Sequence, residues 1–433
     1  MTSTFAALTL ALAALPVGAS AQTQAPPPTS APARTALQTR AEQVIALING
    51  KVEPADIFTA RFRAAVSDAQ LKSLNTNLTA QFGAAVSATL DPPEGTRAKI
   101  EIRFERGLAK GVIGIQPDED NRVGELVITS AEPLAVAGDT PQAIAAELAA
   151  LPGTVNAWFA PLNGGAPLIA INADKPLALG SAFKLYVLAA LAEDVKAGRR
   201  KWTDVVPLSE KSYPSGQLQD WPEGAPVTLH TLASLMISIS DNTATDQLIA
   251  TLGKERILQA MRDSGHSKPG ANDPFLTTRE LFLLKASPDA LIDIWRKGGT
   301  VTRTATAAMI ARTTAPLDKI NGAFANGPRA IDIEWFASPA DIAKLFAHMR
   351  RTADPRAFEI LAINSQASAA MKETWRYVGF KGGSEPGVMN LTWIATDQAG
   401  RDWVLTLGWN NAAAVVDEGK LLALARRILV LPR

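Results

Sequence analysis

The chain has 433 residues, 47% of them hydrophobic, so it is long enough to bury two cores. Its 43 Lys and Arg residues nearly balance its 42 Asp and Glu residues, which argues against a protein that holds nucleic acid through phosphate contacts. Cysteine is absent and there are only three histidines, so disulfides and thiol nucleophiles are excluded and a metal site is not expected. We therefore expect two domains and no cofactor.

The first 21 residues have the pattern of a secretion signal. An apolar run is followed by a Pro-Gly break and by Ala19-Ser20-Ala21, a small-x-small cleavage site, although no Lys or Arg precedes the run. The run is too short for a convincing membrane span, and no cysteine is available for a lipid anchor. We expect cleavage after Ala21 and a periplasmic or secreted protein without a stable membrane anchor.

Residues 22–36 are rich in Pro, Ala, Thr and Ser, which predicts an extended linker. Helical periodicity begins near Leu37, and a second helical stretch runs from Phe58 to Leu78. Residues 98–105 then alternate between apolar and charged side chains, which indicates a half-buried strand. Two more strand-like runs follow, residues 108–116 and 122–132, with a polar turn between them at 118–121.

Helices followed by an antiparallel sheet predict a small α+β domain over residues 37–135. Its order of elements resembles the cone-shaped steroid-isomerase or polyketide-cyclase fold. No acid/base pair is placed in an obvious pocket there, so we interpret it as a packing or partner-binding module without chemistry of its own.

Residues 136–433 are predicted to form the second domain. Thr140-Pro141 is a typical helix start, and two strands at 155–162 and 167–173 are joined by the hairpin signal Asn163-Gly164-Gly165. These elements lead into the sequence LALGSAFK, in which a Gly-led turn delivers Ser181 at the start of an apolar helix.

Ser181 and Lys184 are the candidate nucleophile and base. Residues three apart share one face of a helix, so the hydroxyl and the amine can meet, and the helix N-terminus supplies free amide donors beside them. A lysine activates a serine when burial or nearby charge lowers its pKa. The same four residues are also common at ordinary helix starts, where serine caps the helix and lysine is solvated.

A second candidate motif is Ser240-Asp241-Asn242, which follows an apolar helix. Its Ser240 hydroxyl can relay a proton to a leaving group, and Asn242 can bind a substrate amide and the lysine. Asp241 is better suited to holding the loop. Such a triplet alone is also typical of a helix cap or turn.

A third motif is Lys381-Gly382-Gly383, ahead of strand-like runs at 389–395 and 402–410 and a closing helix at 418–431. Lys381 can attract an acidic group of a substrate, and Gly383 allows a substrate to lie close to the backbone.

The three motifs together, each on its expected element, resemble the penicillin-recognising serine hydrolases and most closely the class A β-lactamases. The resemblance covers about residues 140–433 and implies an antiparallel sheet flanked by helices. With the front domain, it is similar to the two-domain β-lactamase-like proteins of clavulanic-acid gene clusters. It implies that the amides of Ser181 and Ser384 form the oxyanion hole and that Tyr213 lines the cleft, although a turn role suits Tyr213 equally.

Two departures from the family limit what the resemblance implies. The family has Thr or Ser where this chain has Gly382, so one donor to a substrate carboxylate is lost. The family's Glu-x-x-Leu-Asn, which activates the deacylating water, is absent before residue 338. Glu280 and Glu334 are the candidates for that base, but Thr277 and Glu280 also fit a capping box, and a structural carboxylate is the better interpretation of each.

The sequence therefore predicts a serine hydrolase that forms an acyl-enzyme at Ser181 and hydrolyses β-lactams. The alternatives are an esterase, a D-alanyl peptidase, or a β-lactam-binding protein that releases its acyl group slowly. In each case the partner is a small molecule. A Ser-His-Asp hydrolase is disfavoured because Ser181 lacks the Gly-x-Ser-x-Gly elbow.

Overall fold

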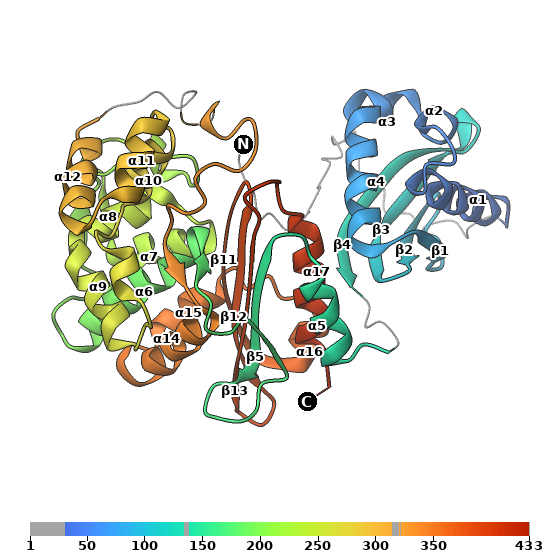
Figure 1. Cartoon of the computed structure of the whole chain (residues 1–433). Coiled ribbons are helices and arrows are strands. Elements are labelled where there is room, and N and C mark those ends of the chain that lie inside the picture. Colours follow the sequence, from blue (N-terminus) through green and yellow to red (C-terminus); the bar gives the residue numbers. More distant parts are fainter. Residues whose placement is uncertain (1–30, 134–137, 314–319, 321, 433) are drawn as a thin grey trace. The chain divides into compact units, whose positions relative to one another are not determined.

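The computed structural model describes residues 31–133, 138–313, 320 and 322–432 (Figure 1). The predicted signal and residues 22–30 of the predicted linker lie outside this part of the chain. The described chain separates into two compact units, one containing the residues up to Asp139 and Leu422–Arg427, the other containing Thr140–Leu421 and the residues from Ile428. No helix in the described ranges is long and apolar enough to cross a membrane.

The first unit consists of helices followed by a four-stranded antiparallel sheet of order β1-β2-β3-β4. Its elements are α1 (Ala31–Ile48), α2 (Pro54–Ile57), α3 (Ala60–Ala65), α4 (Asp68–Phe82), β1 (Ala85–Leu90), β2 (Arg97–Phe104), β3 (Gly107–Gln116), η1 (Pro117–Glu119) and β4 (Arg122–Pro133). The buried residues of β2 alternate as predicted. The α+β class of this unit is thereby confirmed, whereas its likeness to steroid isomerases stays a prediction.

Three details of this unit differ from the sequence prediction. Helix α1 begins at Ala31, so residues 31–36 are helical and not an extended linker; Pro32 is compatible with a first helical turn. The stretch predicted from Phe58 to Leu78 is divided into α3 and α4, because Thr59 and Ser67 each cap a new helix with their side chains. Strand β1 was not predicted, since only its first residue is buried and the pattern is weak.

The second unit is built on a five-stranded antiparallel sheet of order β11-β12-β13-β5-β6. Its strands are β5 (Thr154–Pro161), β6 (Ile169–Ile171), β11 (Trp375–Glu385), β12 (Val388–Asp397) and β13 (Asp402–Asn410). The hairpin predicted at residues 163–165 joins β5 and β6. Short pairs also form between β7 (Leu177–Ala178) and β10 (Phe336–Ala337) and between β8 (Val205–Pro207) and β9 (Pro226–Thr228).

Helices cover both faces of this sheet (Figure 1). The helical elements that follow β4 include α5 (Pro141–Ala149), η2 (Gly180–Phe183), α6 (Lys184–Lys196), η3 (Leu218–Asp220), α7 (Leu229–Ser238), α8 (Asn242–Leu252), α9 (Lys254–Asp263), η4 (Pro269–Asn272), α10 (Thr278–Lys285), α11 (Asp289–Lys297), α12 (Thr300–Ala311), α14 (Pro339–Thr352), α15 (Arg356–Ala362), α16 (Ala369–Thr374) and α17 (Glu418–Leu429). Helices α5 and α16 lie on one face, and α14 and α15 lie on the other (Figure 1). The predicted sheet flanked by helices is confirmed.

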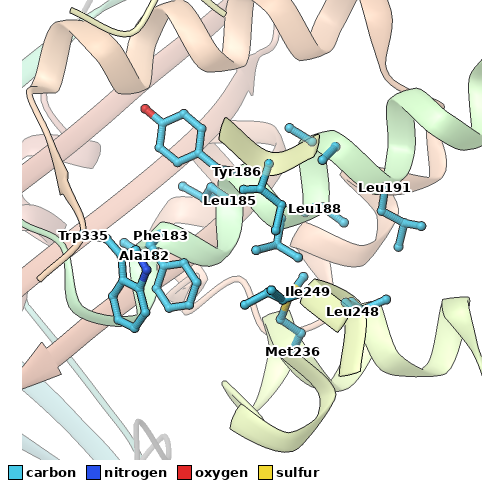
Figure 2. Close-up of a cluster of buried hydrophobic side chains, with 14 of the residues drawn as sticks. Ala182, Phe183, Leu185, Tyr186, Leu188, Leu191, Met236, Leu248, Ile249 and Trp335 are labelled. Carbon is cyan, nitrogen blue, oxygen red and sulfur yellow. The ribbon is translucent and has the colours of Figure 1, made fainter. Parts of the chain in front are cut away.

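Helix α6 forms the centre of the core on the helical side. Every residue from Lys184 to Asp194 is buried, and the apolar ones pack against α7 and α8, as Figure 2 shows for Met236, Leu248 and Ile249. The ring of Trp335 stacks on that of Phe183, with centroids 3.6 Å apart (Figure 2). A helix buried all round cannot move easily, so the turn before it is held on a rigid support.

Candidate active site

Ser181 and Lys184 meet as the sequence predicts, but through a different local geometry. Ser181 lies in the 3₁₀ turn η2, and α6 begins only at Lys184. A 3₁₀ turn has three residues per turn, so positions i and i+3 are eclipsed. The Lys184 Nζ atom lies 3.1 Å from the Ser181 Oγ atom.

The Lys184 amine has four oxygen neighbours. Besides Ser181 Oγ, these are the Ser240 carbonyl at 2.8 Å, Ser240 Oγ at 3.0 Å and Asn242 Oδ1 at 2.7 Å. The carbonyl and the amide oxygen can only accept, so they take two N–H groups. When the amine is neutral, its lone pair then faces the hydroxyls of Ser181 and Ser240. This is the arrangement needed to take a proton from Ser181.

Burial lowers the pKa of Lys184 to about 7, although the nearby Asp241 and Asp246 carboxylates oppose the shift. Its side chain is completely buried, and no ion pair joins it to a carboxylate within the described ranges. A substantial fraction of this lysine is therefore neutral at neutral pH, when it can act as a base.

Ser240 links the two lysines of the site. Its Oγ atom lies 3.0 Å from Lys184 Nζ and 3.1 Å from Lys381 Nζ. Ser240 lies between α7 and α8 with a φ angle of 59°, in the left-handed region that a residue with a side chain rarely adopts. This conformation places both its carbonyl and its hydroxyl on Lys184.

Lys381 comes from β11 and is 3% exposed. It donates hydrogen bonds to Ser240 Oγ at 3.1 Å and to the Gly382 carbonyl at 2.6 Å. Burial and the neighbouring Lys184 both lower its pKa. A buried amine with neutral partners gains its charge most easily when an anionic substrate group arrives beside it.

The strand β11 passes directly against the Ser181 turn. A methyl group on Gly383 would overlap the backbone of Leu179, Ser181 and Ala182. A methyl group on Gly180, whose φ angle is +49°, would lie 3.0 Å from the amide nitrogen of Ser384. The amides of Ser181 and Ser384 therefore lie close together, as an oxyanion hole requires.

The other predicted site residues hold this arrangement together. Asp241 caps α8 by accepting from the Ala244 amide at 2.8 Å, and it also accepts from the amides of Gln217 and Leu218. This bears out its predicted role in the loop. Asn242 donates to the Tyr213 carbonyl at 3.2 Å, which brings the Tyr213 backbone to the site.

Neither candidate for the deacylating base is free. Glu280 forms the capping box with Thr277 and pairs with Lys254 at 2.6 Å, as the structural interpretation predicts. Glu334 is buried and pairs with Lys285 at 2.9 Å. Each carboxylate is held by a lysine of the same unit, which is the structural role that the sequence favours for it.

Trp335 supports the turn that carries Ser181. Its carbonyl accepts from the Leu179 amide at 2.9 Å, and its ring stacks on Phe183. It therefore holds the chain on both sides of Ser181. No motif signals this role, because it depends on a contact between residues far apart in the chain.

Within the same described ranges, no group of three or more His, Cys, Asp or Glu residues could hold a metal ion.

The family model described as the β-lactamase enzyme family matches residues 140–406. The chain belongs to this family and is a serine hydrolase of the β-lactamase and penicillin-binding-protein type. No curated protein sequence matches it significantly.

Among solved structures, similar chains include a β-lactamase from Sphaerobacter thermophilus, with 22% identity, a TM-score of 0.47, and coverage of 68% of this chain and 98% of that one. Another is PBP-A, with 18% identity, a TM-score of 0.46, and coverage of 67% and 94%. A third is a β-lactamase from Chitinophaga pinensis, with 16% identity, a TM-score of 0.46, and coverage of 67% and 95%.

Proposed function

We propose that Ser181 is acylated by β-lactams, or by esters and amides of similar shape, and that the acyl-enzyme is then hydrolysed. The observation that carries this proposal is the Lys184 amine, 3.1 Å from Ser181 Oγ, with its pKa lowered to about 7. A base with a pKa near neutrality is well matched to removing the proton of a serine hydroxyl.

Acylation proceeds through residues already in contact. Neutral Lys184 takes the Ser181 proton as Oγ attacks the carbonyl carbon, and the amides of Ser181 and Ser384 stabilise the negative oxygen that forms. The C–N bond of the lactam then breaks. Ser240 passes a proton from Lys184 to the leaving nitrogen, which its position 3.0 Å from Lys184 supports.

The site favours substrates with an anionic group. Lys381 is a buried amine that contacts Ser240 and a backbone carbonyl, so a carboxylate beside it would stabilise its charged form. Gly382 offers no hydroxyl to that carboxylate, which weakens the binding of penicillins.

We also propose, from the sequence alone, that residues 1–21 direct the protein to the periplasm or out of the cell.

A second function is a protein that remains acylated for a long time. It is favoured by the ion pairs of Glu280 with Lys254 and of Glu334 with Lys285, which occupy both carboxylates considered for activating water. In this case β-lactams would be trapped and not degraded.

One experiment tests the proposal. Purified protein is mixed with a chromogenic cephalosporin while the colour and the mass of the Ser181 peptide are followed, with Ser181→Ala as the blank. Steady colour release that is lost in S181A supports hydrolysis, and a persistent mass adduct after one burst supports the trapping function. Colour release that survives in S181A contradicts the assignment. If neither signal appears, β-lactams are excluded, and esters and D-alanyl peptides are tested in the same way.

A further inference from the structure

A buried cluster of three charged side chains lies outside the constellation of Ser181, Lys184, Ser240 and Lys381. Lys285, at the end of α10, donates to Glu334 Oε1 at 2.9 Å and to Glu385 Oε1. The three side chains are 0%, 1% and 5% exposed. The second oxygen of Glu385, Oε2, is buried and has no hydrogen-bond partner in the described part of the chain.

Glu385 belongs to the strand edge that forms the site. The pairing of β11 with β12 is regular from Tyr377 to Glu385, so alternate side chains face the same side. Glu385 is therefore on the same face as Lys381, which contacts Ser240, and as Gly383, which lies against the Ser181 turn. The cluster lies at the end of this face, one residue beyond the Ser384 amide.

The other two members reach the opposite side of the same turn. Glu334 is followed by Trp335, whose carbonyl accepts from the Leu179 amide and whose ring stacks on Phe183. Lys285 is further fixed through its carbonyl, which accepts from Arg329 Nε at 2.6 Å. The cluster thus connects α10, the segment beside the Ser181 turn and the end of β11.

The charges of the cluster depend on pH. Burial opposes the charge of Lys285, but the carboxylates of Glu334 and Glu385 outweigh it and raise its pKa. Burial raises the pKa of Glu385 to about 8, although Lys285 counteracts this and Glu334 adds to it. Glu385 therefore keeps its proton at neutral pH in the folded protein. The same carboxyl loses its proton at a lower pH in the unfolded chain, so the stability that it contributes is full at low pH and is lost as the pH rises to about 8.

We propose that Lys285, Glu334 and Glu385 are positioning residues that hold the end of β11 against the Ser181 turn and so fix the two oxyanion-binding amides. The inference rests on the proposed acylation of Ser181. None of the three residues touches the reacting atoms; they act through Ser384 and Trp335. Breaking the cluster should slow the acylation step more than it weakens substrate binding.

The test compares two lysines of buried or partly buried ion pairs. Lys285→Met removes the cation of the cluster, and Lys254→Met removes the cation of the Glu280 pair, which joins α9 and α10. Acylation by a fluorescent penicillin is followed at several concentrations, which separates binding from the acylation rate. We expect K285M to lose at least tenfold in rate and K254M to be unaffected. Equal rates in the two variants overturn the proposal.

A second readout does not need acylation. Amide hydrogen exchange of residues 381–385 should increase in K285M and not in K254M; unchanged exchange there overturns the proposal. If the wild-type protein is not acylated at all, acylation by β-lactams is refuted, while the exchange result still decides the role of the cluster.

A third variant covers the case in which K285M fails to fold. Glu385→Gln mimics the protonated carboxyl, so the ratio of acylation rates at about pH 9 and pH 7 should be severalfold higher in E385Q than in the wild type. The charged groups facing Glu385 are Lys285 and Glu334, and both remain in this variant. An unchanged ratio overturns the proposal.

Discussion

Two lysines of the same unit are equally buried and yet serve opposite purposes. Lys184 and Lys285 are both 0% exposed, but the pKa of Lys184 is lowered and that of Lys285 is raised. Lys184 contacts hydroxyls, a carbonyl and an amide, whereas Lys285 lies between two carboxyl groups. The partners of a buried lysine, and not its burial alone, therefore decide whether it becomes a base or a fixed cation.

The strongest challenge to this comparison is the removal of the base. Lys184→Ala should reduce the rate of acylation by about 10² to 10⁴-fold, the usual contribution of a general base. The measurement is the rate of labelling by a fluorescent penicillin. Lys196→Ala, at the exposed end of the same helix, is the control and should label normally. Labelling of K184A within a few-fold of the wild type would show that another group removes the proton.

The second prediction concerns the proposed oxyanion hole, which the amides of Ser181 and Ser384 form beside the Lys184 base. Gly383→Ala places a methyl group in the backbone of the Ser181 turn, so β11 must move away and the Ser384 amide with it. We expect a loss of about 10² to 10³ in acylation rate, as for the removal of one oxyanion donor. Gly382→Ala, whose methyl group would mainly meet the tip of the Phe380 ring, should lose much less. Equal losses of acylation rate in G383A and G382A would contradict the close approach of Gly383 to the backbone of the Ser181 turn.

The third prediction gives Lys184 the kind of partner that Lys285 has. In the wild type, acylation should rise as pH passes about 7, because the neutral amine is the active form. Asn242→Asp puts a carboxylate at the position of the oxygen 2.7 Å from Lys184 Nζ, which favours the ammonium form and should move this rise about 1 to 3 pH units upward. Asn242→Ala removes the contact without adding charge. A pH–rate profile of N242D that rises at the same pH as the wild type would refute the role of the partners.

The smallest effect on catalysis is expected at Glu280. Because this carboxylate holds the start of α10 and pairs with Lys254, Glu280→Ala should lower the free energy of unfolding by about 1 to 2 kcal/mol. The rates of acylation and of acyl release should stay unchanged. Thermal melting and the lifetime of the Ser181 adduct measure the two quantities separately. A longer adduct lifetime in E280A would mean that Glu280 assists release after all.

Each motif of the acylation site could be predicted because it is local, whereas the meeting of the three motifs was predicted only from the family resemblance. Ser181 and Lys184 are three residues apart, and Ser240 and Asn242 are two apart, so short-range geometry places each pair. The same holds for the Thr140 cap and the hairpin between β5 and β6.

The Lys285, Glu334 and Glu385 cluster could not be predicted, since its members come from three segments distant in sequence and nothing local marks their burial. For Glu334 the sequence favours a structural carboxylate over a catalytic base, but it does not indicate the partners Lys285 and Glu385. In the first unit, the helical start at Ala31 and strand β1 were missed because neither has a strong hydrophobic pattern. Sequence reasoning thus finds the reacting groups more easily than the parts that hold them.

At Ser240 the backbone conformation and the proposed reaction favour different residues. Glycine would adopt a φ angle of 59° with less backbone strain than serine, but it has no hydroxyl to share between Lys184 and Lys381. Ser240→Gly and Ser240→Ala both lose that hydroxyl, and the glycine variant should be the more stable of the two by about 1 kcal/mol. The strained backbone at this position is therefore kept together with the hydroxyl that bridges the two lysines, and stability engineering of this chain should leave Ser240 untouched.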